Sequence, residues 1–227
     1  MRYLISAIAL GIALAIAGCG QTTPEPAASP AALDTPAPDP QPEPPPPPEA
    51  NSQEISTHGI GPAQLGLTLG ELKALLGPRI NYVTQSPFLA DFDAIAVRQG
   101  DEILFHVLHL AGEPMTDADV VQGVLTTNPR YQTANGVGVG TSLADAEDRY
   151  GEATLSRHTA DAALEYVQFE RPPAVNISFG TQAASETYAG LYPEGAGEYQ
   201  ETGEYQPDAA IGSVLVICLN ETCAGDS

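Results

Sequence analysis

Two pairs of aspartates come closest in this sequence to a catalytic or metal-binding motif. Asp91 and Asp93 stand one residue apart, as do Asp117 and Asp119. Paired carboxylates can serve acid–base chemistry or bind Ca²⁺, but neither pair is followed by the glycine and glutamate of an EF-hand loop. We interpret both pairs as solvated acids, the second of them beginning a helix or turn.

The four histidines do not follow a metal-ligand pattern. His106 and His109 fall within a predicted strand, where residues three apart point to opposite faces. His58 and His158 have no acidic or cysteine neighbour at metal-ligand spacing. The sequence also contains no nucleophile elbow, phosphate loop or dinucleotide fingerprint. We therefore predict no metal site, no cofactor and no catalytic residue.

Residues 185–207 combine tyrosines with glutamates and contain Gly-Glu-Tyr-Gln twice. One interpretation is an exposed acidic loop before the last strand. The other is a contact loop, in which tyrosines supply rigid contact area and glutamates select a basic partner. The candidate contact residues are Tyr188, Tyr192, Glu198, Tyr199, Glu204 and Tyr205.

Two short helices are predicted within the segments 65–77 and 139–151, which align without a gap. Thr68 and Ser142 suit the N-cap position, and an acid three residues later can complete a capping box. Apolar side chains recur at helical spacing, and each segment ends in a glycine that suits a helix terminus. Helices of two to three turns must pack on something larger.

An antiparallel sheet is the expected support for these helices. The sequence predicts two hairpins and two further strands, at 94–97 with 103–110, 164–170 with 174–179, 120–127, and 211–219. We therefore predict an α+β fold with two repeats of short helix plus antiparallel β-hairpin, the helices packed on a curved antiparallel sheet.

A family resemblance rests on Leu65–Pro78 and Val139–Glu152, each a Thr or Ser cap and a short helix ending in Leu-Gly or Tyr-Gly before a hairpin. This pattern resembles small lipoproteins of the outer-membrane barrel-assembly machinery, and the tandem repeat of secreted β-lactamase inhibitor proteins. Such domains are binding or scaffolding modules, so the resemblance implies a role without catalysis.

The N-terminal segment resembles the signal peptide of a bacterial lipoprotein. A basic start precedes an uncharged apolar run over 4–17, which is short for a transmembrane helix. The run ends in Ile16-Ala17-Gly18-Cys19, which is similar to a lipobox and implies cleavage after residue 18 and lipid attachment at Cys19. Gly20, where inner-membrane lipoproteins carry Asp, favours the outer membrane. An ordinary signal peptide or an uncleaved anchor are the alternatives.

A proline-rich linker is predicted over 19–53, because this stretch holds more than half of the 21 prolines and little that could form a core. The globular domain then covers 54–227, with halves at about 54–127 and 128–227. Near its end, Cys218 and Cys223 form an even pair in an expected oxidising compartment, which predicts a disulfide.

The charge balance narrows the possible partners. Eight Lys and Arg face 29 Asp and Glu, for a net charge of −21, which excludes electrostatic binding to nucleic acid and repels anionic headgroups. We expect a lipid-anchored, periplasm-facing lipoprotein that acts as a non-enzymatic binding or scaffolding module on a protein or cell-wall partner. The alternatives are a periplasmic hydrolase or other enzyme on an uncommon scaffold, and a structural envelope spacer.

The lipid anchor can be tested directly. We expect the full chain to partition into the detergent phase of a phase-separation assay, because several acyl chains anchor stably. A chain made without residues 1–19 should remain in the aqueous phase. Mature wild-type protein in the aqueous phase, cleaved elsewhere than before Cys19, would contradict the lipobox interpretation.

Overall fold

The structure, a computed structural model, describes residues 52–219 except 90, 160–163, 185–187 and 194–196. The predicted signal peptide, the predicted lipid-attachment site Cys19 and nearly all of the predicted linker lie outside the described residues, as does Cys223. Within the described part, the helices are too short and insufficiently apolar to cross a membrane.

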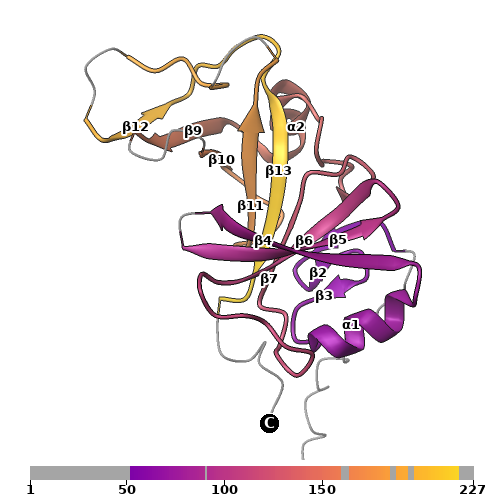
Figure 1. Cartoon of the computed structure of the whole chain (residues 1–227). Coiled ribbons are helices and arrows are strands. Elements are labelled where there is room, and N and C mark those ends of the chain that lie inside the picture. Colours follow the sequence, from indigo (N-terminus) through magenta and orange to yellow (C-terminus); the bar gives the residue numbers. More distant parts are fainter. Residues whose placement is uncertain (1–51, 90, 160–163, 185–187, 194–196, 220–227) are drawn as a thin grey trace, which may run out of the picture. The chain divides into compact units, whose positions relative to one another are not determined.

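Strands dominate the domain (Figure 1). In chain order the elements are β1 (Glu54–Ser56), β2 (Gly59–Ile60), β3 (Ala63–Gln64), α1 (Leu69–Leu76), β4 (Ile80–Leu89), β5 (Phe92–Gln99), β6 (Glu102–Leu110), β7 (Gly123–Thr126), β8 (Gln132–Thr133), α2 (Leu143–Tyr150), β9 (Ala153–His158), β10 (Glu165–Phe169), β11 (Ile177–Gln182), β12 (Tyr199–Thr202) and β13 (Ala210–Ile217).

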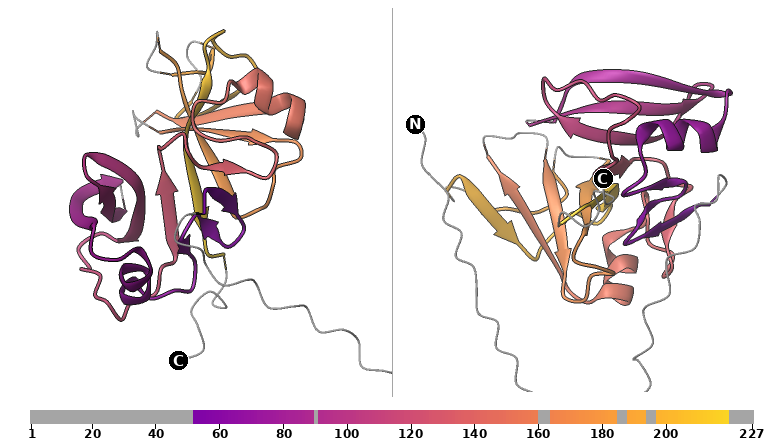
Figure 2. Two further views of the ribbon diagram at one scale, coloured as in Figure 1. Left: turned by 90° about the vertical axis from the view of Figure 1, so that its right-hand side faces the viewer. Right: turned by 90° about the horizontal axis from the view of Figure 1, so that it is seen from below.

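Most strands belong to one antiparallel sheet of nine described strands, in the order β12-β9-β10-β11-β13-β7-β6-β5-β4. The sheet is strongly twisted, so that β11 and β13 cross β4, β5 and β6 at a steep angle (Figure 1). Strands β4–β6 and β9–β12 form its two wings (Figure 2). A second, small sheet has the order β3-β2-β1-β8, and its β2 lies against β7 and β13.

Both predicted helices and their caps are confirmed. Thr68 accepts a hydrogen bond from the Glu71 backbone N–H at 3.2 Å, and the Glu71 carboxylate accepts one from the Thr68 backbone N–H at 2.8 Å. Ser142 caps α2 by accepting from the Asp145 N–H at 3.1 Å, but Asp145 accepts only from the Ser142 hydroxyl. The shorter aspartate side chain therefore forms half of a capping box where glutamate forms all of it.

The segment before each helix forms backbone hydrogen bonds with a segment later in the chain, and the two helices have equivalent bonds. Gly66 N–H donates to Val121 O at 3.0 Å, and Gly140 N–H donates to Ile211 O at 2.8 Å. A single bridge follows in each case, Thr68 with Val120 and Ser142 with Ala210. Each short helix is therefore fixed at its first turn by long-range backbone pairing, which its own length could not supply.

The sheet buries one face, called here the core face, beneath both helices and the small sheet. Strand alternation directs Phe105 and Val107 of β6, and Val214 and Val216 of β13, into this core. The helices add the apolar residues Leu69, Leu72, Leu143, Ala146 and Tyr150. Among the described residues, those of the core lie from 55 to 216, so this part of the chain contains a hydrophobic core of its own.

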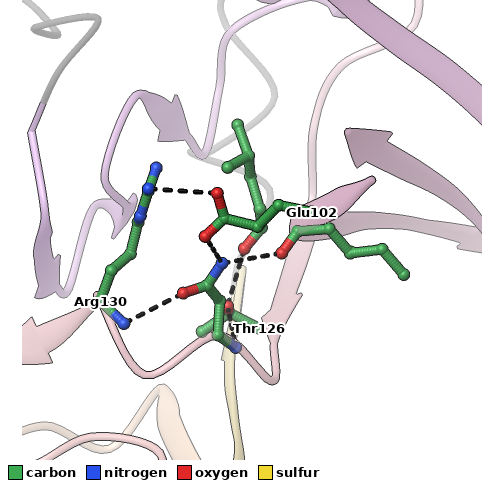
Figure 3. A network of polar contacts seen from close by, with 6 residues as sticks. Glu102, Thr126 and Arg130 are labelled. Carbon is green, nitrogen blue, oxygen red and sulfur yellow. Dashed lines mark hydrogen bonds and ion pairs between the residues drawn. The ribbon is translucent and has the colours of Figure 1, made fainter. Parts of the chain in front are cut away.

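A polar network joins the start of β6 to the end of β7 and to the residues that follow β7 (Figure 3). The Glu102 carboxylate accepts hydrogen bonds from Asn128 Nδ2 at 2.8 Å and from Arg130 Nη2 at 3.2 Å. Asn128 Nδ2 also donates to the Ile103 carbonyl at 2.9 Å, and the Thr126 hydroxyl donates to the Leu104 carbonyl at 2.9 Å. These bonds satisfy polar groups at the point where the chain leaves the sheet.

The predicted fold class, an α+β fold of two helix-plus-hairpin repeats, is wrong. The domain is mostly β, with two helices of eight residues among its described elements. Each helix is followed by a run of antiparallel strands that extends beyond one hairpin, and the small sheet belongs to neither hairpin. Helix caps can be recognised from a few neighbouring residues, whereas strand pairing depends on distant ones. The predicted fold class therefore overstated the contribution of the two helices to the domain.

Burial of α1 leads to a matched pair of substitutions on one helix. Leu72 is completely buried and Ala74 is exposed. We expect Leu72→Asp to lower the free energy of unfolding by more than about 3 kcal/mol, because it buries an unpaired charge, and Ala74→Asp by less than about 1 kcal/mol. Urea denaturation measures both, and equal losses would contradict the packing of this helix.

Candidate ligand-binding cleft

The face of the nine-stranded sheet opposite the helices, called here the outer face, is also apolar at its centre. Strand alternation directs Ala94, Leu108, Leu125 and Leu215 of four adjacent strands onto this face, where Phe88 and Leu89 of β4 pack against them. A sheet in contact with water normally shows polar side chains here. This second apolar cluster therefore indicates a surface with another use.

A cleft with a volume of about 710 Å³ opens on the outer face between the two wings. Leu108, Gly123, Leu215 and Ile217 form its floor. A Cβ atom on Gly123 would lie 3.4 Å from the Leu108 Cβ, so the glycine keeps the floor open. The walls are Leu89, Phe92 and Leu110 on one side, and Ser156, His158, Leu164, Tyr166 and Tyr199 on the other.

Several large apolar side chains in these walls are unusually exposed. The exposed fractions are 38% for Phe92, 55% for Leu110, 39% for Tyr166 and 61% for Tyr199. Half of the large hydrophobic side chains that are exposed in the described part thus line a single cleft. Isolated exposed hydrophobics are ordinary, whereas their concentration in one concave site is typical of a binding surface.

The wall formed by β9, β10 and β12 carries polar groups. Tyr199 lies opposite His158, and Glu201 lies opposite Ser156, which in turn lies opposite Tyr166 on the next strand. The Tyr199 hydroxyl donates a hydrogen bond to Glu201 Oε1 at 2.9 Å. Ser156, His158, Tyr166 and Tyr199 line the cleft, and Glu201 adjoins them on β12. We call these five residues the polar wall.

Side chains on the other side of β9 bind the described parts of residues 185–207, called here the tyrosine-rich segment. The guanidinium carbon of Arg157 lies 4.1 Å from the ring centre of Tyr188 and 4.3 Å from that of Tyr192. Its Nε and Nη2 atoms both donate to Gln200 Oε1, at 2.9 and 2.7 Å. This stacked cation lies in the row that pairs with Gln200 and the buried Glu165, away from the polar wall.

Glu165 is a buried carboxylate that anchors the same segment to the sheet. It accepts hydrogen bonds from the backbone N–H groups of Ala189 and Gly190, at 2.8 and 2.9 Å, and from the Thr181 hydroxyl. Burial and the neighbouring Glu165 carboxylate raise the pKa of Tyr192. The hydrogen-bond donors around Glu165 therefore stabilise a carboxylate that would be costly to bury alone.

The predicted contact residues fall into two groups. Tyr188 and Tyr192 stack on Arg157, and Tyr205 donates to Glu147 Oε2 of α2 at 2.7 Å. Burial and this bond raise the pKa of Tyr205 to about 12. Tyr199, Glu198 and Glu204 are exposed, and Tyr199 is the member that lines the cleft. These contacts and β12 make the described parts of the segment structural as well as available for contact.

The aspartate pairs serve turns. Asp119 accepts from the Thr116 N–H and hydroxyl, at 2.6 and 2.7 Å, so this pair begins a turn as predicted. Asp93, predicted to be solvated, is 6% exposed. A hydrogen bond from the Ser86 side chain and one from the Gly112 N–H lower the pKa of Asp93.

The histidines of β6 lie on opposite faces, as the strand pattern predicts. His106 is on the outer face, with its ring centre 4.6 Å from that of Phe88, and burial lowers its pKa. His109 pairs with Asp93 on the other face. No cluster of three metal-ligating side chains occurs among the described residues.

Cys218 lies at one end of the cleft and is disulfide-bonded. Its backbone N–H donates to the Gln122 carbonyl at 2.8 Å, which extends the pairing of β13 with the β7 segment. The predicted partner, Cys223, lies outside the described residues, so the pairing remains a prediction.

The cleft residues escaped the sequence analysis, although a signal for them exists. In β6 the run Ile103–Leu110 is apolar at both odd and even positions. Such a run indicates a strand covered on both faces. The sequence does not show that one of these two faces of β6 lacks a covering layer, because this depends on the topology of the sheet.

No protein-family model and no curated protein sequence matches this chain. Among solved structures, the chain is similar to the uncharacterized protein yfeY from Escherichia coli, with a TM-score of 0.47 and 14% sequence identity. That similarity covers 73% of this chain and 99% of the other. It is too low to transfer any property to this chain.

The buried histidine beside the cleft makes stability depend on pH. Because burial lowers the pKa of His106, the unfolded chain binds a proton first as the pH falls below the ordinary value of 6.5. We expect the free energy of unfolding to decline more steeply below about pH 6.5 in the wild type than in His106→Gln. Urea denaturation at several pH values measures this slope. An unchanged slope in His106→Gln would contradict the assignment.

Proposed function

We propose that this protein is a lipid-anchored, non-enzymatic binding module of the cell envelope, whose cleft holds the hydrocarbon chain of an amphiphile. The observation that carries the proposal is the apolar cleft on the outer face, where exposed Phe92 and Leu110 face the wall of Tyr166 and Tyr199. The lipobox at Cys19 supports a position at the membrane, where such molecules occur.

The chemistry of the floor favours hydrocarbon over a peptide. The floor belongs to β6, β7 and β13, whose backbone groups pair with neighbouring strands. Its side chains, Leu108, Leu215 and Ile217, offer no hydrogen bond. An extended peptide buried there would leave its own N–H and C=O groups unpaired, at about 1–3 kcal/mol for each group. A hydrocarbon chain carries no such groups.

The size of the cleft agrees with a small ligand. Pockets for small molecules enclose about 300–1,000 Å³, and this cleft has about 710 Å³. Its two walls belong to the two wings of one twisted sheet, so the cleft is a hollow between them and not a flat surface. A concave apolar floor with polar groups on one wall suits a molecule with one chain and one head.

Substitution at the rim of the cleft tests this proposal. We expect Leu110→Gln to weaken the binding of monolaurin, a neutral single-chain amphiphile, by about five- to tenfold, because it removes up to about 1.5 kcal/mol of apolar contact. Titration calorimetry below the micelle concentration measures the affinity, on protein without residues 1–19.

A matched control is available in Leu191→Gln. Leu191 is 43% exposed and does not line the cleft, so this variant should bind as the wild type does. Monolaurin recovered intact after incubation agrees with a binding role. The proposal fails if the wild type does not bind, if both variants bind equally well, or if the ligand is hydrolysed.

A further inference from the structure

We infer that the cleft selects amphiphiles whose head carries an ammonium group and no net negative charge, with the head held at the polar wall. This inference rests on the proposed function, because it concerns the head of a molecule whose chain lies in the cleft. It follows from three features of the site: two tyrosine rings, a carboxylate on the edge strand β12, and the distribution of positive charge.

The pairing register places the two rings and the carboxylate on one surface. Tyr199 and Glu201 of β12 lie opposite His158 and Ser156 of β9, and Ser156 lies opposite Tyr166 of β10. Residues opposite one another in antiparallel strands point to the same face, with Cβ atoms about 5 Å apart. Tyr166 and Tyr199 therefore stand on either side of β9, with Glu201 in the same row as Tyr166.

This arrangement has the chemistry of an ammonium site. The face of an aromatic ring carries negative potential and attracts cations, and aromatic residues recognise alkylammonium heads in this way. Tyr166 and Tyr199 keep 39% and 61% of their surface exposed, which leaves ring surface open to a ligand. The hydrogen bond from the Tyr199 hydroxyl holds the Glu201 carboxylate beside the rings, at an O–O distance of 2.9 Å.

Positive charge is directed away from this wall. Arg157 is the one Lys or Arg among the described residues that line the cleft. Its guanidinium lies on the opposite face of β9, between Tyr188 and Tyr192. Asp91 lines the other wall, and the chain as a whole carries a net charge of −21. A carboxylate or phosphate monoester head would therefore meet repulsion, whereas an ammonium would be attracted.

The positions of the ligand's head and of its hydrocarbon chain follow from the same arrangement of cleft residues. With the ammonium at Tyr166, Tyr199 and Glu201, the chain passes over Leu215 and Ile217 toward Phe92 and Leu110. The polar and apolar parts of the ligand then each meet matching surface. The head of the ligand contacts the polar wall, and the end of its chain contacts the opposite wall. The head and the chain length of a test ligand can therefore be varied independently.

Three amphiphiles with related chains and different heads test the inference: dodecyltrimethylammonium, neutral monolaurin, and laurate. At physiological salt, where exposed charges are screened beyond about 8 Å, we expect dodecyltrimethylammonium to bind about five- to tenfold more tightly than monolaurin, and laurate most weakly. These factors correspond to exposed cation–π and ion-pair contacts. Calorimetry below each micelle concentration gives the affinities.

Variants of the polar wall locate the preference. Tyr199→Leu and Glu201→Gln should each reduce the ammonium preference, the ratio of the dodecyltrimethylammonium affinity to the monolaurin affinity, to about twofold or less. Tyr199→Phe should retain much of the preference that Tyr199→Leu loses, because it keeps the ring face. Asp148→Asn is the charge-matched control. It removes one exposed acid from α2, a helix that lies on the side of the sheet opposite the cleft, and should retain the full preference.

The outcomes separate the two proposals. Equal affinity of the wild type for all three heads, with Leu110→Gln weakening each, overturns the ammonium site and leaves the hydrocarbon cleft standing. An equal loss of preference in Asp148→Asn and Glu201→Gln also overturns it, because overall charge would then explain the selection. Failure of the wild type to bind any of the three overturns both proposals.

Discussion

The pairing of β13 with β7 is the contact on which the rest of the domain depends. It joins residues 214–217 to residues 123–126 and turns two sets of antiparallel strands into one sheet. Val214 and Val216 complete the core beneath the helices, while Leu215 and Ile217 form the floor of the cleft. A single strand therefore supplies both the packing and the site, because consecutive side chains alternate between its faces.

Twist converts this joined sheet into a concave site. A sheet of nine strands does not remain flat, and accumulated twist carries the β4–β6 wing across the direction of β11 and β13. The outer face thus forms two walls that consist mainly of strand residues. The described parts of residues 185–207 help to fix one wall, because Arg157 of β9 and Glu165 of β10 bind them from the core side of the sheet. The wall that faces a ligand is therefore supported from behind.

Features that depend on neighbours in sequence were predictable, whereas those that depend on topology were not. Thr68 and Ser142 mark helix starts, and the hairpin around Gly100 follows from alternation and a turn. By contrast, β4 contains Pro87, which an edge strand tolerates, and β12 lies in a polar stretch that reads as a loop. The cleft was missed because Leu108, Leu215 and Ile217 read as core residues until the topology shows which face is uncovered.

The place of β13 in the chain has a consequence for the time order of folding. Ribosomes synthesise the chain from its N-terminus, so β7 and its neighbour β6 are complete before the residues of β13 exist. Contacts between segments so distant in sequence form slowly and leave apolar surface open in the meantime. A chain that ends before residue 210 can form its first hairpin but cannot close its core. Products truncated before β13 therefore stay recognisable to chaperones and proteases by their open apolar surface.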